Sequence, residues 1–207
     1  MSKILLHTCC APCSIYPIDQ LRAQGYDVTS FFYNPNIHPF TEHLRRKETL
    51  LNYATMIDLP VIDAEKYDFE EYLRRVAHQV EARCGVCYEM RLRETARTAK
   101  ERGFDAFSTT LLVSPYQKHD LVREVAEAAS REYGVPFVYQ DWRGGFRAGQ
   151  ARARELGLYR QPYCGCIYSE AERYRARPPK LLFPPPPGTY GTSMPVSNAK
   201  PGRGEGK

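Results

Sequence analysis

The chain has 207 residues, a formal net charge of +5 and seven cysteines. A chain of this length can bury a core without disulfide cross-links, so a disulfide scaffold is not required. The segment before the first cysteines is too short for a secretory signal, and no window is long and apolar enough to span a membrane. We therefore expect a cytoplasmic protein without membrane contact, in which clustered thiols are metal ligands or redox pairs.

Strands and helices alternate along the predicted order. The pattern predicts, in chain order, a strand over 4–6, a helix over 12–24, a strand over 28–33, a helix over 41–56, a weaker strand over 60–63, a helix over 69–80, a helix that follows residue 87 and reaches 102, a strand over 106–112, a helix over 118–132, a strand over 135–139 and a helix over 149–156. This alternation predicts one α/β domain over 1–177, with an open, mainly parallel sheet flanked by helices. Segment 178–207 is rich in Pro and Gly and is expected to be a disordered tail.

The cysteines form three tight clusters. They are Cys9-Cys10-x-x-Cys13, Cys84-x-x-Cys87 and Cys164-x-Cys166. In open α/β sheets ligands bind beyond the carboxyl ends of the strands, and the first cluster directly follows the first strand. We therefore expect a metal site at that edge of the sheet.

The spacing of the first two clusters is typical of a zinc tetrathiolate built by Cys10, Cys13, Cys84 and Cys87. The adjacent thiol of Cys9 argues against a purely structural zinc, which has no use for it. An iron-sulfur cluster also accepts four thiolates and carries electrons, which zinc does not.

The third cluster, Cys164-Gly165-Cys166, allows three interpretations. The glycine lets the backbone bend tightly, so the two thiols can close a strained disulfide that is easily reduced. The alternatives are two unpaired buried thiols or two further metal ligands.

Basic residues recur near the cysteine clusters and the ends of the predicted elements. Two runs stand out, Arg45-Arg46-Lys47 and the set Arg147, Arg152 and Arg154. They indicate either a face that contacts phosphates or an ordinary solvated helix surface.

Five motifs occur in order along most of the chain. They are HTCCAPC at 7–13, FYNPNI at 32–37, RCGVCY at 83–88, FSTTLLVSPY at 107–116 and LYRQPYCGC at 158–166. Together they resemble the epoxyqueuosine reductase QueH family. The resemblance implies reductive removal of the epoxide oxygen from epoxyqueuosine in tRNA, the last step of queuosine biosynthesis, without cobalamin and with an electron donor that the sequence does not identify.

The resemblance also implies roles for the cysteines. It assigns Cys9, Cys10, Cys84 and Cys87 as ligands of a 4Fe-4S cluster, and Cys164 with Cys166 as a redox-active pair. Spacing alone favours Cys13 over Cys9, and here we follow the family. Cys13 then lies at the start of a helix, available to a second metal.

Epoxide removal requires two electrons and two protons, whereas a 4Fe-4S cluster passes one electron at a time. A dithiol stores two electrons, and an additional mononuclear iron would polarise the epoxide oxygen as a Lewis acid. The candidate ligands of such an iron are Cys13, Cys164, Cys166 and Asp141. Candidate proton donors are Tyr33, Tyr116 and Tyr163.

A modified base drawn out of an RNA loop needs polar groups along its edge. The candidates beside the loop motifs are Asn34, Asn36, Gln117, Arg160 and Gln161.

Two alternatives remain. A PP-loop (HUP-like) ATP-dependent tRNA-modifying enzyme shares the Rossmann-like opening of strand, loop and helix, but it needs a phosphate loop rich in Ser and Gly where this chain has cysteines. A non-catalytic, zinc-stabilised RNA-binding module would use the same thiols without redox chemistry.

Overall fold

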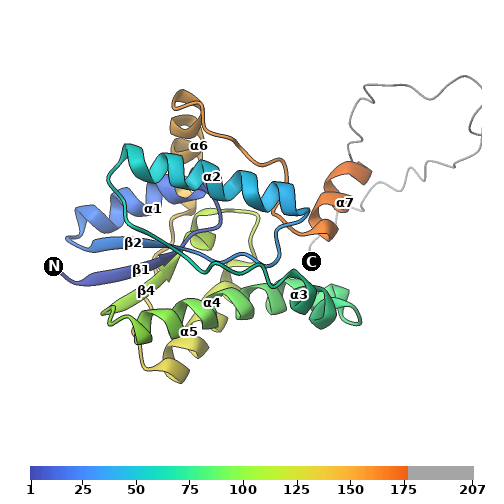
Figure 1. The fold of residues 1–207 in the computed structure, drawn as a ribbon, viewed down its shortest axis with the longest axis horizontal. Coiled ribbons are helices and arrows are strands. Elements are labelled where there is room, and N and C mark those ends of the chain that lie inside the picture. The colour runs from blue at the N-terminus through green and yellow to red at the C-terminus, as the bar shows by residue number, and fades with distance from the viewer. Residues whose placement is uncertain (177–207) are drawn as a thin grey trace, which may run out of the picture.

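The computed structural model describes residues 1–176 and contains one four-stranded sheet with the order β3-β2-β1-β4 (Figure 1). Its strands are β1 (Lys3–His7), β2 (Asp27–Phe32), β3 (Val61–Asp63) and β4 (Ala106–Thr109). All neighbouring strands are parallel. The expected parallel α/β sheet is therefore confirmed.

Helices cover both faces of this sheet. They are α1 (Ala11–Ala23), α2 (Phe40–Met56), α3 (Phe69–Val76), α4 (Arg83–Glu101), α5 (His119–Tyr133), α6 (Phe146–Glu155) and α7 (Ile167–Ala176), with short 3-10 turns η1 (Val80–Ala82), η2 (Thr110–Val113) and η3 (Arg143–Gly145). In Figure 1, α1, α2 and α6 lie on one side of the sheet, and α4 and α5 lie on the other. None of the described helices is long and apolar enough to cross a membrane.

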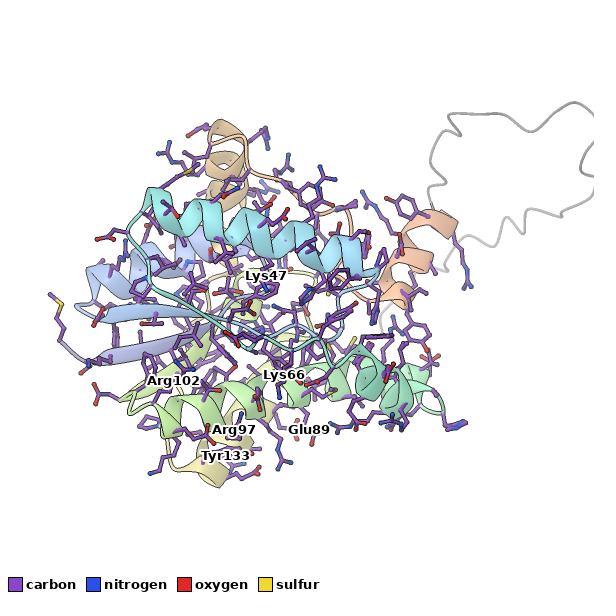
Figure 2. All side chains as sticks on the ribbon, in the orientation of Figure 1. Lys47, Lys66, Glu89, Arg97, Arg102 and Tyr133 are labelled. Atoms are coloured by element: carbon purple, nitrogen blue, oxygen red, sulfur yellow. The ribbon has the colours of Figure 1, made fainter. Side chains whose placement is uncertain are left out.

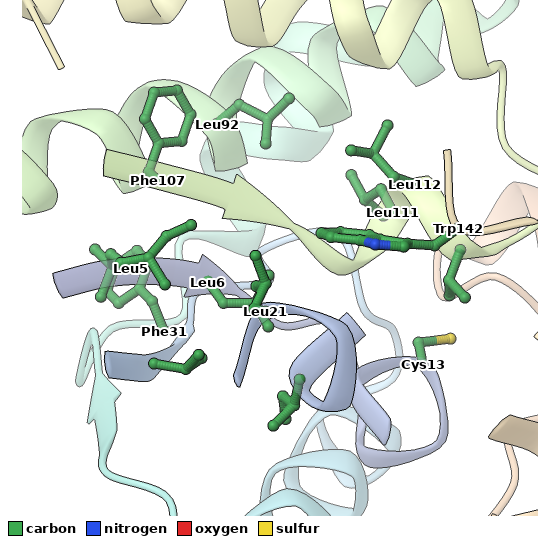
Figure 3. Packing of buried hydrophobic residues seen from close by; sticks show 14 of the residues in the cluster. Leu5, Leu6, Cys13, Leu21, Phe31, Leu92, Phe107, Leu111, Leu112 and Trp142 are labelled. Atoms are coloured by element: carbon green, nitrogen blue, oxygen red, sulfur yellow. The ribbon is translucent and has the colours of Figure 1, made fainter. Parts of the chain in front are cut away.

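The two helical layers explain the composition of β1. A parallel strand covered on both faces needs a continuous apolar run rather than alternation. Ile4, Leu5 and Leu6 provide that run and are fully buried. Figure 3 shows Leu5 and Leu6 in one cluster with Leu92 of α4 and Leu21 of α1, so side chains from both layers complete a single core around the central strand.

The register of the strands positions the site. His7 at the end of β1 is opposite Phe31 of β2 and Thr109 of β4, so these strands end at one edge. The loop that carries Cys9, the 33–39 segment and η2 all leave the sheet from that edge.

Two sequence predictions about strands are wrong. The expected strand over 135–139 contributes only an isolated bridge between Phe137 and Phe107, because Pro136 has no N–H to donate and only its carbonyl oxygen joins the pairing. The strand expected over 106–112 ends at Thr109, whose side-chain oxygen accepts a hydrogen bond from the Leu111 N–H at 3.2 Å and turns the chain into η2.

The helices differ from the predictions in four places. Helix α3 ends at Val76 rather than at the expected residue 80, and η1 follows it. The helix expected after residue 87 begins at Arg83, so the second cysteine cluster lies inside its first turns. Helix α6 begins at Phe146, three residues before the predicted 149, and α7 was not predicted. The expected boundary at 177 and the tail over 178–207 lie outside the described residues.

Candidate metal centre and substrate cavity

The side chain of His7 is held by hydrogen bonds at the edge of the sheet. It is fully buried, its Nδ1 lies 2.9 Å from the Thr109 hydroxyl oxygen, and its Nε2 lies 3.3 Å from the Tyr33 carbonyl oxygen. Burial, together with the positive charge of Arg91, lowers the pKa of His7 to about 3. The imidazole is therefore neutral near pH 7 and joins strands rather than donating protons.

The first cysteine cluster is compact. The loop after β1 turns directly into α1, and this turn brings the sulfurs of Cys9, Cys10 and Cys13 within 4.8 Å of one another. Cys9 and Cys10 sulfurs are 3.7 Å apart, and the Thr110 hydroxyl lies 3.5 Å from the Cys9 sulfur. Spacing favoured Cys13 and the family resemblance favoured Cys9, but the structure brings both to the same place.

The pKa values of these three thiols are shifted in different directions. Hydrogen bonds from Cys10 and Cys13 lower the pKa of Cys9 well below its ordinary value. Burial is the main cause of the raised pKa of Cys10, and hydrogen bonds to its neighbours raise that of Cys13. Cys9 is therefore the most acidic of the three thiols, and a metal bound by all three would displace protons from Cys10 and Cys13.

The other four cysteines line a second, smaller space. Cys84 and Cys87 lie in the first turns of α4, and Cys164 and Cys166 lie in the loop before α7. All four line a cavity of about 330 Å³. Gly165 has φ +151°, and a Cβ there would lie 3.1 Å from Ile37, so the glycine allows this loop to pack closely on the 33–39 segment.

A larger cavity of about 940 Å³ adjoins this smaller cavity. Cys9 and Cys13 line the larger cavity, and Cys164, Arg91 and Gln117 line both. The three cysteine clusters, more than 150 positions apart at their extremes, therefore face one continuous space. A volume of this order accommodates a nucleoside-sized ligand.

Arg91 is a buried charged residue that lines both cavities. It is 1 % exposed, and its guanidinium donates to the Cys87 sulfur at 3.0 Å and to the Cys87 carbonyl oxygen at 3.2 Å. Burial by itself lowers the pKa of Arg91, but the neighbouring Cys87, Cys164 and Cys9 raise it above its ordinary range. A buried cation whose neighbours are sulfurs fits a site that holds negative charge.

From the sequence, Arg91 is only one of several basic residues near the cysteine clusters, and it was not predicted to belong to the metal site. Its position four residues after Cys87 places both on one face of α4, and this helical spacing could have identified it.

Several expected substrate residues meet at the cavities. Gln117, Arg160 and Gln161 line the larger one, and Asn36 lines the smaller one. The Gln161 amide nitrogen lies 2.9 Å from the Cys10 sulfur, and the Gln117 amide nitrogen lies 3.2 Å from the Cys164 sulfur. One amide therefore contacts a cysteine of the first cluster, and the other contacts a cysteine of the third cluster.

Buried acceptors in the same region have no partner. The side-chain oxygens of Asn36 and Gln161 and the Tyr72 hydroxyl are buried without a hydrogen bond within the described residues. Buried polar atoms normally have partners, so these groups are suited to a polar ligand. The side-chain oxygen of Asn34 is also buried without a partner, but Asn34 lines neither cavity, and its amide nitrogen donates to the Thr8 carbonyl oxygen at 3.0 Å.

Asp141 and two of the three candidate tyrosines are already engaged. Asp141 pairs with Arg143 at 2.6 Å, lines neither cavity, and has its pKa lowered to about 2 by hydrogen bonds from Arg143. Tyr33 donates to Asp68, and Tyr163, which lines the larger cavity, donates to the His38 carbonyl oxygen. Tyr116 is the remaining candidate proton donor. It lines both cavities and is 84 % exposed.

The basic run at 45–47 is largely structural. Arg46 is 1 % exposed and donates to Glu42 at 2.7 Å and to the carbonyl oxygens of Cys164 and Tyr163 at 2.8 and 3.2 Å. Lys47, which is labelled in Figure 2, pairs with Asp63 of β3. Arg46 is therefore buried against the loop that carries Cys164 and Cys166 and stabilises it, instead of facing solvent.

Comparisons with known proteins agree with this site. The family model described as epoxyqueuosine reductase QueH matches residues 4–172. An epoxyqueuosine reductase QueH of Dehalococcoides mccartyi is 42 % identical over 172 residues, covering 83 % of this chain and 94 % of that protein. The Thermotoga maritima protein of the same name is 36 % identical, covering 84 % of this chain and 93 % of its own length.

A solved structure described as a predicted subunit of a tRNA methyltransferase from Methanocaldococcus jannaschii has the same fold, with a TM-score of 0.52, 10 % identity and 75 % of each chain covered. This likeness concerns the fold alone and agrees with the open parallel α/β sheet expected from the sequence. The extent of the family match and of the identity to its named members shows that this chain belongs to the epoxyqueuosine reductase QueH family.

Proposed function

We propose that this chain removes the epoxide oxygen of epoxyqueuosine in tRNA and so completes queuosine biosynthesis, without cobalamin. The observation that carries the proposal is that six of the seven cysteines line two adjoining cavities large enough for a modified nucleoside, while the sulfur of the seventh, Cys10, lies within 4.8 Å of those of Cys9 and Cys13. The cytoplasm suits this chemistry because thiols stay reduced there.

The donor set fits an iron-sulfur cluster. Cys9 and Cys10 from the loop after β1, and Cys84 and Cys87 from α4, would hold a 4Fe-4S cluster, with Arg91 offsetting its negative charge. Such a cluster supplies one-electron transfer when it is bound. A zinc site would leave the remaining three thiols without a role.

Cys13, Cys164 and Cys166 remain for a second function. As a dithiol, Cys164 and Cys166 give up two electrons and two protons on forming a disulfide, which balances conversion of an epoxide to an alkene and water. An external reductant must then restore the dithiol. Alternatively, these residues with Cys13 would hold a single iron that supplies Lewis-acid chemistry.

Side chains of this chain would position the substrate. The free oxygens of Gln161 and Asn36 would accept hydrogen bonds from N–H or O–H groups of the modified nucleoside, and Gln117 keeps the Cys164 sulfur in place. Tyr116 and Tyr163 are the tyrosines that line the larger cavity. Of these two, Tyr163 already donates to a carbonyl oxygen, so Tyr116 is the better placed to deliver a proton.

The proposal is tested by anaerobic reconstitution with iron and sulfide, followed by reaction with tRNA that carries epoxyqueuosine and a chemical reductant. We expect a brown protein and a nucleoside product lighter by one oxygen atom, with neither cobalamin nor ATP added. A colourless zinc protein with no turnover would support the RNA-binding module, and turnover that depends on ATP would support the PP-loop alternative.

A further inference from the structure

We propose that four arginines at the larger cavity, Arg147, Arg154, Arg160 and Arg173, form an RNA-binding rim that holds the phosphates beside the reacting nucleotide. Tyr116 at the same cavity stacks on a neighbouring base. This inference rests on the proposed function, because it assumes that one base of an RNA loop enters the cavity.

Three segments of the chain contribute the four arginines of the rim. Arg147 and Arg154 come from α6, Arg160 from the loop that follows it, and Arg173 from α7. All four are exposed, and all four line the cavity that also contains Cys9 and Cys13. The positive groups therefore surround the entrance to the thiols rather than a distant face.

Many other surface arginines pair with carboxylates, whereas in the part of the chain that the structure describes the rim arginines do not. On α4, Arg93 pairs with Glu89 and Arg97 pairs with Glu94, as the labels in Figure 2 help to locate. Arg74, Arg123, Arg143 and Arg152 also form ion pairs with carboxylates. Within residues 1–176, no carboxylate lies within 4.0 Å of a rim guanidinium; Arg160 donates only to the neutral Gln150 at 3.1 Å.

The carboxylate at this cavity does not neutralise the rim. Glu172 lines it, but its side chain is engaged by Arg83. Four guanidinium groups without counter-charges, close together on one edge, have the electrostatic character of a phosphate-binding surface. An RNA loop, with one phosphate per nucleotide, supplies anions at a spacing that several arginines can contact at once.

Tyr116 supplies the second component of single-strand recognition. Its side chain is 84 % exposed, and its ring meets Phe146 edge to face with centroids 5.9 Å apart. This contact holds the tyrosine in place while one face of the ring remains free. Stacking of an unpaired base on an aromatic face is the usual way that proteins hold single-stranded RNA.

The basic run at 45–47 cannot perform this role as well. Arg46 is buried under the cysteine loop and Lys47 is paired with Asp63, so only Arg45 of that run stays available to solvent. The structure therefore moves the expected phosphate contacts from α2 to α6 and its neighbours.

The test measures binding of an RNA hairpin that contains the anticodon loop with guanine at the wobble position, by fluorescence anisotropy over a series of salt concentrations, using the reconstituted full chain. Replacing Arg147, Arg154 and Arg160 together with Gln should weaken binding and reduce the log–log salt slope by about 0.7 for each phosphate that the variant no longer neutralises. The matched control is Arg152→Gln, on the same helix but paired with Glu155, which should leave the slope unchanged.

Tyr116→Ala should weaken binding by about fivefold to about 150-fold, the range for loss of one stacked base, without changing the slope. Tyr116→Phe should restore the affinity, since it keeps the ring. Thermal unfolding of each variant checks that these exposed substitutions leave the fold intact.

A wild-type slope in the triple variant, or an equal loss in Arg152→Gln, overturns the RNA-binding rim whatever the reductase assay gives. If instead the rim variants lose RNA binding as expected but the wild-type protein does not deoxygenate epoxyqueuosine in tRNA, the proposed reaction fails while the rim stands.

Discussion

Replacing Arg46 with Met should destabilise the protein strongly, because this side chain is a buried link between α2 and the loop of the third cysteine cluster. Its guanidinium makes three hydrogen bonds, to Glu42, Cys164 and Tyr163, at 2.7, 2.8 and 3.2 Å. Removing it leaves the Glu42 carboxylate buried with only the Tyr159 hydroxyl as a partner.

Breaking a buried ion pair by removing one partner costs about 3–5 kcal/mol. In a chain of this size each kcal/mol lowers the midpoint of thermal unfolding by about 2–4 °C, so the expected loss is roughly 6–20 °C. Circular dichroism of the reconstituted protein during heating measures it. A second substitution, Glu42→Gln, should recover part of the loss because no unpaired charge then stays buried.

The adjacent residue provides a matched control. Arg45 is exposed, and its guanidinium lies over the Tyr159 ring at 3.8 Å, a contact worth about 0.5–1 kcal/mol at such a site. Arg45→Met should therefore lower the midpoint by only a few degrees, at about 2–4 °C per kcal/mol. The reasoning is refuted if Arg46→Met unfolds at the wild-type temperature, or if it matches Arg45→Met.

Three further predictions concern the cysteine clusters. Cys84→Ala or Cys87→Ala should deplete iron and sulfide in the reconstituted protein; contents near those of wild type would remove these residues from the ligand set. Ser at Cys164 and Cys166 should keep the brown colour but abolish turnover, and normal turnover with reductant present would make this pair structural. Gly165→Ala forces a Cβ to within about 3 Å of Ile37 at a positive φ, so it should cost about 1–3 kcal/mol in urea unfolding; an unchanged midpoint would show that the loop has room to move.

The sequence predicts the parts of the site that follow from the ends of strands. Cys9 and Cys10 follow a strand whose apolar run is unmistakable, so their place at the sheet edge could be predicted from β1 alone. Asp141 could not be placed in this way, because the segment before it forms only one bridge to the sheet and its carboxylate turns back to Arg143. The rule about strand ends does not apply where no strand forms.

The sequence also does not predict which individual charged residues are buried. Arg46 lies four residues after Glu42, a spacing that equally describes a surface ion pair on a solvated helix. Only the packing of the cysteine loop over α2 shows that this pair is inside. The joining of the three cysteine clusters likewise depends on α7 and the loop before it, for which the sequence has no strong periodic signal.

The wide separation of the thiols along the chain has a consequence for synthesis. Cys13 leaves the ribosome 151 residues ahead of Cys164, an interval of roughly 10–30 s at ordinary elongation rates. During that time the early thiols have no partners from the end of the chain and are open to oxidants. The complete set of thiols therefore exists only once the chain is finished, and the yield of metal-loaded protein in the cell should depend on oxygen exposure during translation as much as on iron supply.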